Sequence, residues 1–147
     1  MPLDTFLVII LSGLLGSYVL LTLALWMPGV GLPRLDFAKV MSNFMYGETY
    51  DGKPPYIAGV IAVYLNGVFF ALLYATVIAQ YLPGIPLLRG AIWGVILFAV
   101  SGLWFVPHFL KEGYFISHVH KQAWISSVIV HAAYGVILGW LCPIVTI

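Results

Sequence analysis

Charged side chains are scarce in this sequence. Its 147 residues include six Lys or Arg and five Asp or Glu, so 7% of the chain is charged, against roughly 25% in an ordinary soluble domain. So few charges do not cover the surface of a soluble fold, and disorder needs more charge and less hydrophobicity. With a net charge of +1, the chain has no excess of basic residues that could bind the phosphates of a nucleic acid. These absences exclude soluble globular, disordered and nucleic-acid-binding proteins and favour a protein embedded in a bilayer.

Cysteine and catalytic motifs are scarce as well. Cys142 is the single cysteine, so no disulfide forms within the chain, and we interpret it as a small apolar filler beside Pro143. The sequence contains no nucleotide-binding loop and no nucleophile motif. We therefore expect no enzymatic activity and no catalytic residue.

Long apolar stretches dominate what is present. Hydrophobic residues make up 63% of the chain and the mean hydropathy is +1.06. Crossing a bilayer takes about 20 residues of helix, and four stretches are long enough: residues 3–27, 55–82, 88–109 and 122–145. Lipid cannot satisfy backbone hydrogen bonds, so each stretch is predicted to be helical. The sequence predicts an all-α, multi-pass membrane protein, with four transmembrane helices in a compact bundle forming one membrane domain over residues 1–147.

The first loop contains a candidate amphipathic helix at residues 35–45. Leu35, Ala38, Met41 and Met45 share one face at helical spacing. This helix could lie flat at the membrane surface, pack on a partner subunit, or cap its own bundle.

The basic residues predict an orientation. Five of the six lie in the first and third of the connections between spans, namely Arg34, Lys39, Lys53, Lys111 and Lys121. The short second connection has Arg89 alone beside it. The positive-inside rule therefore places both longer loops in the cytoplasm and both termini outside. Aromatic residues cluster near the expected boundaries, as in interfacial belts: Trp26, Tyr56, Trp104 and Trp124 near one side and Tyr81 and Trp140 near the other.

Small residues recur at every third or fourth position in all four spans. Such stripes let helix backbones approach closely in lipid. The residues expected to pack helices together are Gly13, Gly16, Gly67, Ala71, Ala75, Gly90, Gly94, Ser127, Gly135 and Gly139.

His131 lies mid-way along the fourth span on this stripe, and an ionisable group inside a membrane is a functional candidate. It could bind haem iron, donate to a quinone carbonyl or relay a proton. The structural alternative is a neutral histidine bonded to Asn66, Tyr64 or Tyr74. Asn66, in the second span, is the other candidate cofactor-binding residue. No cofactor is expected, with haem or quinone as the candidates if His131 binds one.

Three further histidines form a candidate metal site. His108, His118 and His120 lie near the cytoplasmic ends of the third and fourth spans, and imidazole suits zinc, iron or copper.

Three short motifs resemble a known family. They are Leu88-Arg89-Gly90 with Gly94, His131-Ala132-Ala133-Tyr134-Gly135 with Gly139, and the helix at 35–45. Together they resemble a group of small, uncharacterised prokaryotic four-helix membrane proteins. The resemblance implies a four-helix bundle and supplies no activity. The group is also expected to carry a histidine early in the second span, where this chain has Asn66.

The scarcity of polar chemistry favours a non-catalytic role. We expect an accessory subunit that docks on other integral membrane subunits of a larger complex, preferably a respiratory or photosynthetic electron-transfer complex. The alternatives are a quinone-, haem- or proton-handling protein centred on His131, and a small oligomeric transporter.

Overall fold

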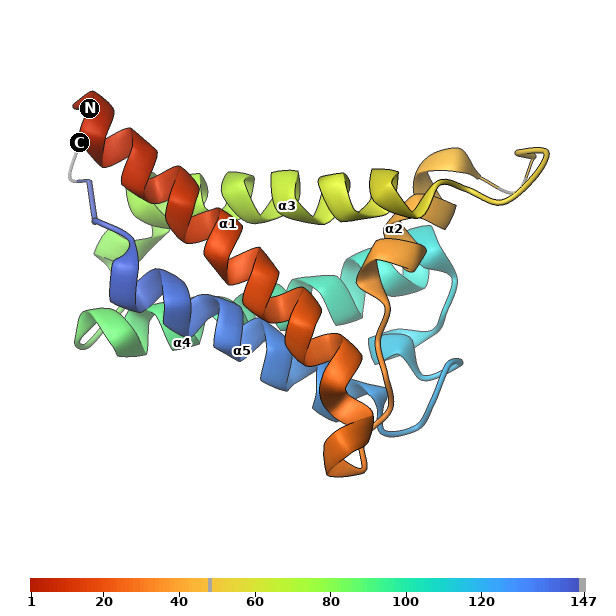
Figure 1. The fold of residues 1–147 in the computed structure, drawn as a ribbon. Coiled ribbons are helices and arrows are strands. Elements are labelled where there is room, and N and C mark those ends of the chain that lie inside the picture. The colour runs from red at the N-terminus through yellow and green to blue at the C-terminus, as the bar shows by residue number, and fades with distance from the viewer. Residues whose placement is uncertain (48, 146–147) are drawn as a thin grey trace.

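The computed structural model describes residues 1–47 and 49–145, and these residues form helices and no strands (Figure 1). In chain order the elements are α1 (Leu3–Trp26), η1 (Met27–Val30), α2 (Phe37–Tyr46), α3 (Tyr56–Leu73), η2 (Tyr74–Ile78), η3 (Ala79–Tyr81), α4 (Pro86–Val100), η4 (Ser101–Leu110), η5 (Tyr114–Ile116) and α5 (Ala123–Leu141). The predicted all-α class is confirmed.

Four continuous helical segments are long and apolar enough to cross a membrane, as predicted. They span Leu3–Val30, Tyr56–Tyr81, Pro86–Leu110 and Ala123–Leu141. The predicted end of the last one at residue 145 is wrong. Pro143 disfavours helical geometry at the residue before it, and Cys142 is extended, with φ −81° and ψ 122°. The residues after α5 pack on η2, where the Val145 amide donates a hydrogen bond to the Ala75 carbonyl at 2.9 Å.

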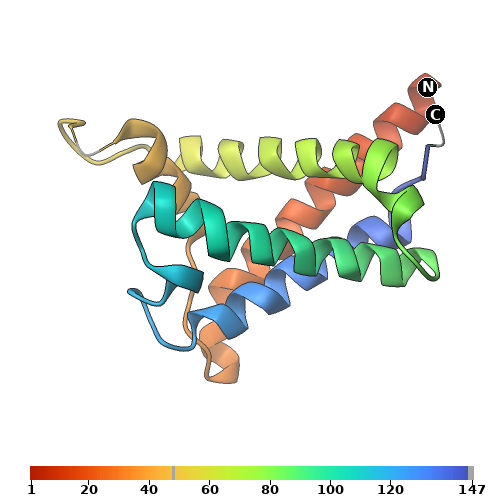
Figure 2. The same cartoon turned by 180° about the vertical axis from the view of Figure 1, so that it is seen from behind.

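The connections fall at two opposite ends of the bundle. The N-terminus and residues 143–145 lie at one end together with the turn between η3 and α4, whereas α2 and the loop between η4 and α5 lie at the other (Figures 1 and 2). The segments that carry five of the six basic residues are therefore all at the second end. α1 crosses the other long helices obliquely (Figure 1).

Glycines lie at two close contacts between the long helices. Between α1 and α3, a Cβ on Gly13 would lie 2.8 Å from the Gly67 carbonyl oxygen and 3.0 Å from the Ala71 Cβ. Between α4 and α5, a Cβ on Gly135 would lie 2.9 Å from the Gly94 Cα. These helix pairs approach so closely because no side chain separates their backbones.

The other small residues named from the sequence lie at the same or adjoining contacts. Gly90 packs against Gly135 and Gly139, and Gly16 lies against the Tyr134 ring. Ala75 and Ser127 are buried.

α2 caps its own bundle. Its Ala38 carbonyl lies directly against Gly59 of α3, and the Ser42 hydroxyl donates to the Pro55 carbonyl at 2.8 Å. The helix begins at Phe37, because the Asp36 side chain caps it. The predicted face needs correction: Ala38 and Ser42 are buried within α2 and Met45 is 54% exposed, because the hydrogen bond to Pro55 draws Ser42 inward.

Two stretches, η2 and η4, are π-helical, a wider winding that recurs at functional sites. η4 contains Pro107, which has no amide hydrogen to donate to the helix. The following loop holds three non-glycine residues in the left-handed region, Lys111, Phe115 and Ile116. Phe115 stacks on Phe98 of α4 with ring centroids 4.9 Å apart. This stacking contact packs the loop against α4.

Candidate ligand cavity

A cavity of about 350 Å³ lies inside the bundle, between α1, α2, α3, α4, η4 and α5. This volume is within the range of small-molecule sites, which are mostly apolar with a few placed polar groups. Both candidate cofactor-binding residues, His131 of α5 and Asn66 of α3, line it. Other polar lining residues are Ser17, Ser101 and Tyr134, and the apolar lining includes Leu20, Phe37, Val63, Phe70, Leu97, Val100, Trp104 and Phe105.

His131 is held by its own helix. Its Nδ1 lies 2.8 Å from the Ser127 carbonyl oxygen and 3.4 Å from the Ser127 hydroxyl. A carbonyl only accepts, so Nδ1 carries the hydrogen and donates. The ring also makes edge contacts with Phe37 and Phe98, at centroid distances of 5.9 and 6.3 Å. Within the described part of the chain, Nε2 has no hydrogen-bond partner, so it is the atom that His131 offers to a ligand.

Asn66 does not bond to His131, contrary to the structural alternative drawn from the sequence. Its side chain is exposed, and it makes no hydrogen bond in residues 1–47 and 49–145. An amide that lacks a partner in an apolar environment costs on the order of 1–3 kcal/mol. Asn66 therefore has both donor and acceptor capacity available to a ligand.

The tyrosines that were predicted as partners of His131 make other contacts. The Tyr74 hydroxyl is 3.5 Å from the Pro86 carbonyl, and among the described residues Tyr64 makes no hydrogen bond to the ring. Tyr134, which the sequence did not single out as a site residue, donates to the Gly67 carbonyl at 2.6 Å. The sequence feature that could have identified Tyr134 as a site residue is its position three residues after His131, on the same helix face.

The cavity has a side opening at Asn66 of α3. Asn66 both lines the cavity and is exposed, so the neighbouring elements do not close over it. α3 packs on α1 and α2, whereas α4 packs on α5. Aromatic contacts bridge the two groups beyond the opening: Phe70 with Trp93 at 6.3 Å toward one end, and Phe44 of α2 with Phe105 at 5.4 Å toward the other.

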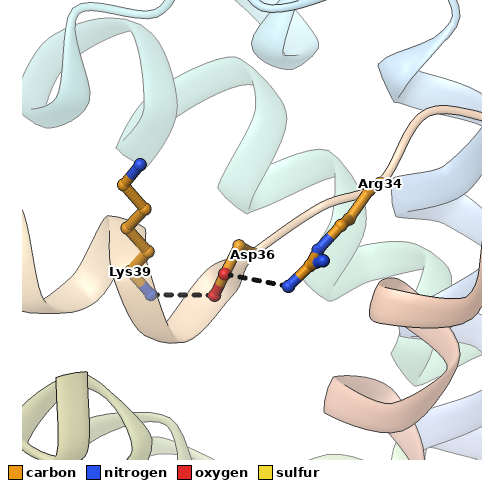
Figure 3. A network of polar contacts seen from close by, with 3 residues as sticks. All are labelled: Arg34, Asp36 and Lys39. Carbon is orange, nitrogen blue, oxygen red and sulfur yellow. Dashed lines mark hydrogen bonds and ion pairs between the residues drawn. The ribbon is translucent and has the colours of Figure 1, made fainter.

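The loop end of the cavity carries charged groups. Arg34, Asp36 and Glu112 are among its lining residues. Figure 3 shows that Asp36 accepts a hydrogen bond from the Lys39 amide at 3.0 Å while its other oxygen lies 3.6 Å from the Arg34 guanidinium. The other polar lining residues are the neutral groups of Ser17, Asn66, Ser101 and Tyr134, and His131.

The three histidines predicted to bind a metal make separate contacts. His108 and His118 turn their Nδ1 atoms to the backbone carbonyls of Trp104 and Lys111, and His120 Nδ1 accepts from the Gln122 amide. Over residues 1–47 and 49–145, no three His, Cys, Asp or Glu side chains gather to hold a metal ion. The physical reason is local: each of these imidazoles is engaged by backbone groups close to it in sequence.

No protein-family model, curated protein or solved structure matches this chain. The resemblance to small four-helix membrane proteins therefore stays a prediction, and the cavity is the basis for assigning a function.

Proposed function

We propose that the chain crosses a bilayer four times and binds a lipid-soluble small molecule in the cavity between α3 and α5. The observation that carries the binding function is that His131 and Asn66, the two polar residues that stood out mid-span in the sequence, line one cavity from different helices. Placing a polar group inside a bilayer costs free energy unless the group has a hydrogen-bonding partner. Two such groups that line the same cavity therefore support a ligand-binding site there.

The outer surface supports membrane residence. Large apolar side chains on the outer faces of all four long helices are exposed, among them Leu11, Leu65, Val95 and Ile129. Aromatic residues near both ends are exposed as well: Trp26, Tyr56, Trp104 and Trp124 near the loop end and Tyr81 and Trp140 near the other. An apolar band between two aromatic belts is what a bilayer requires.

The charge distribution supports an orientation with α2 and the third loop in the cytoplasm. Their end of the bundle carries Arg34, Lys39, Lys53, Lys111 and Lys121. Both termini would then be outside.

The side opening supports entry of the ligand from the lipid. Asn66 is exposed between two aromatic contacts that join α3 and α2 to the neighbouring helices. A molecule dissolved in the bilayer would reach His131 through this opening without crossing the charged loop end.

The test is to extract the protein gently in detergent and identify the molecules that stay bound by mass spectrometry. Val63→Trp would fill the cavity, since Val63 lines it. Ile61→Trp is the matched control on the same helix, because Ile61 is 52% exposed and does not line the cavity. We expect a small apolar molecule on the wild type and on Ile61→Trp, and its loss from Val63→Trp. No bound molecule, or one retained equally by both variants, contradicts the proposal.

The accessory-subunit hypothesis stays a prediction. Exposed apolar helix faces suit lipid and a partner subunit equally, whereas the cavity favours a ligand.

A further inference from the structure

The direction of the His131 hydrogen bond restricts the ligand, and this restriction rests on the proposed binding function. Because Nδ1 donates to the Ser127 carbonyl, Nε2 of the neutral ring presents a lone pair and no hydrogen. A ligand group that forms a hydrogen bond with Nε2 must therefore donate. The sequence suggested that His131 could donate to a quinone carbonyl, and the observed bond assigns the opposite role to the ring.

The cavity walls favour a planar head group. Five aromatic side chains line it, Phe37, Phe70, Trp104, Phe105 and Tyr134. Aromatic rings associate through stacked or edge-on contacts, which strengthen binding beyond the burial of their area. Aliphatic side chains such as Leu20, Val63 and Leu97 line it as well, which suits an apolar tail.

Asn66 complements His131 rather than repeating it. Its amide both donates and accepts, so it suits a second oxygen on the same ring in either redox state. Of these two residues, only His131 therefore discriminates between a hydroxyl and a carbonyl oxygen.

We infer that the cavity binds an aromatic ring that carries a hydroxyl and an apolar tail, a phenol or hydroquinone, with the hydroxyl donating to His131 Nε2. The corresponding quinone binds more weakly, because its carbonyl oxygen and Nε2 would face each other as two acceptors.

The test compares three probes of the same tail length: an alkyl benzohydroquinone, its dimethyl ether and its quinone. Affinities are measured by calorimetry in lipid nanodiscs without oxygen. The hydroquinone should bind on the order of tenfold more tightly than the ether, as the loss of one hydrogen bond predicts. His131→Phe should remove this difference. The matched control is His120→Phe, since His120 is outside the cavity lining and should leave the difference intact.

The outcomes separate this inference from the proposed function. Equal binding of the three probes, or preference for the quinone, overturns the hydroxyl assignment while leaving a ligand cavity in place. A Soret band in the purified protein also overturns it, because the bound ligand would then be haem. If no probe binds and Val63→Trp changes nothing in the extracted protein, the proposed function itself is wrong. Should His131→Phe not fold, the ¹⁵N chemical shifts of His131 in the wild type decide instead: a protonated Nδ1 with an unprotonated Nε2 supports the inference, and the reverse tautomer overturns it.

Discussion

The hydroxyl of Tyr134 on α5 donates a hydrogen bond of 2.6 Å to the backbone carbonyl of Gly67 on α3, and the pair is buried. The Tyr134 ring lies against Gly16 of α1, where an added Cβ would come within 2.7 Å of it. One side chain thus ties three helices together beside the cavity. It also sets the distance between the helices that carry Asn66 and His131.

Removing this hydroxyl should loosen the bundle. Tyr134→Phe leaves the Gly67 carbonyl without its tertiary partner, and we expect a loss of about 0.5–1.5 kcal/mol of stability, measured as a lower midpoint of thermal unfolding in detergent. Tyr81→Phe is the control, since Tyr81 is 78% exposed. Equal midpoints for the two variants would show that the bond contributes nothing.

The contact between α4 and α5 should be intolerant of a single methyl group. An added Cβ at Gly90 would lie 2.6 Å from the Gly139 Cα. Although Ala favours a helix over Gly by roughly 0.5–1 kcal/mol, overpacking costs roughly 1–3 kcal/mol, so Gly90→Ala should destabilise the protein. Gly29→Ala meets no atom within 4 Å and should change the unfolding midpoint little. A Gly90→Ala variant as stable as the wild type would contradict the close approach of these two helices.

The proposed orientation can be read from the labelling of single cysteines. Two single cysteines are introduced in a Cys142→Ala background, Ile85→Cys and Lys53→Cys. Position 85 is in the turn before α4, at the same end as the N-terminus, and position 53 is in the first loop, at the opposite end. A membrane-impermeant thiol reagent should label Ile85→Cys on intact cells and Lys53→Cys only after permeabilisation. The reversed pattern would invert the topology.

Composition and periodicity were sufficient for the helices and for their small-residue contacts. Four apolar runs give four long helices, because backbone groups in an apolar environment have to be satisfied within each segment. The end of α5 was misplaced because apolar residues continue past Pro143, and hydropathy does not register a proline. The inner face of α2 was misassigned because Ser42 is buried through a bond to Pro55, a partner 13 residues away.

The candidate site was predictable only as separate residues. His131 and Asn66 stood out as polar groups mid-span, but nothing in a single sequence places α3 and α5 around one cavity. The bond from His131 to Ser127 could not be predicted, since helical spacing of four residues allows it without requiring it. The other three histidines show the limit of such reasoning. Their position near one end of the spans suggested a metal site, but His108, His118 and His120 each contact a different backbone group.

The most direct test of the central claim is photo-crosslinking from inside the cavity in native membranes. A photoreactive amino acid at Val63, which lines the cavity, is compared with the same group at Ile61 on the outer surface of α3. We predict that position 63 forms an adduct with one small lipid-soluble molecule, identified by mass spectrometry, and that position 61 forms adducts with bulk phospholipid. Adducts with another protein at position 63, or with the same phospholipids at both positions, would contradict a ligand cavity.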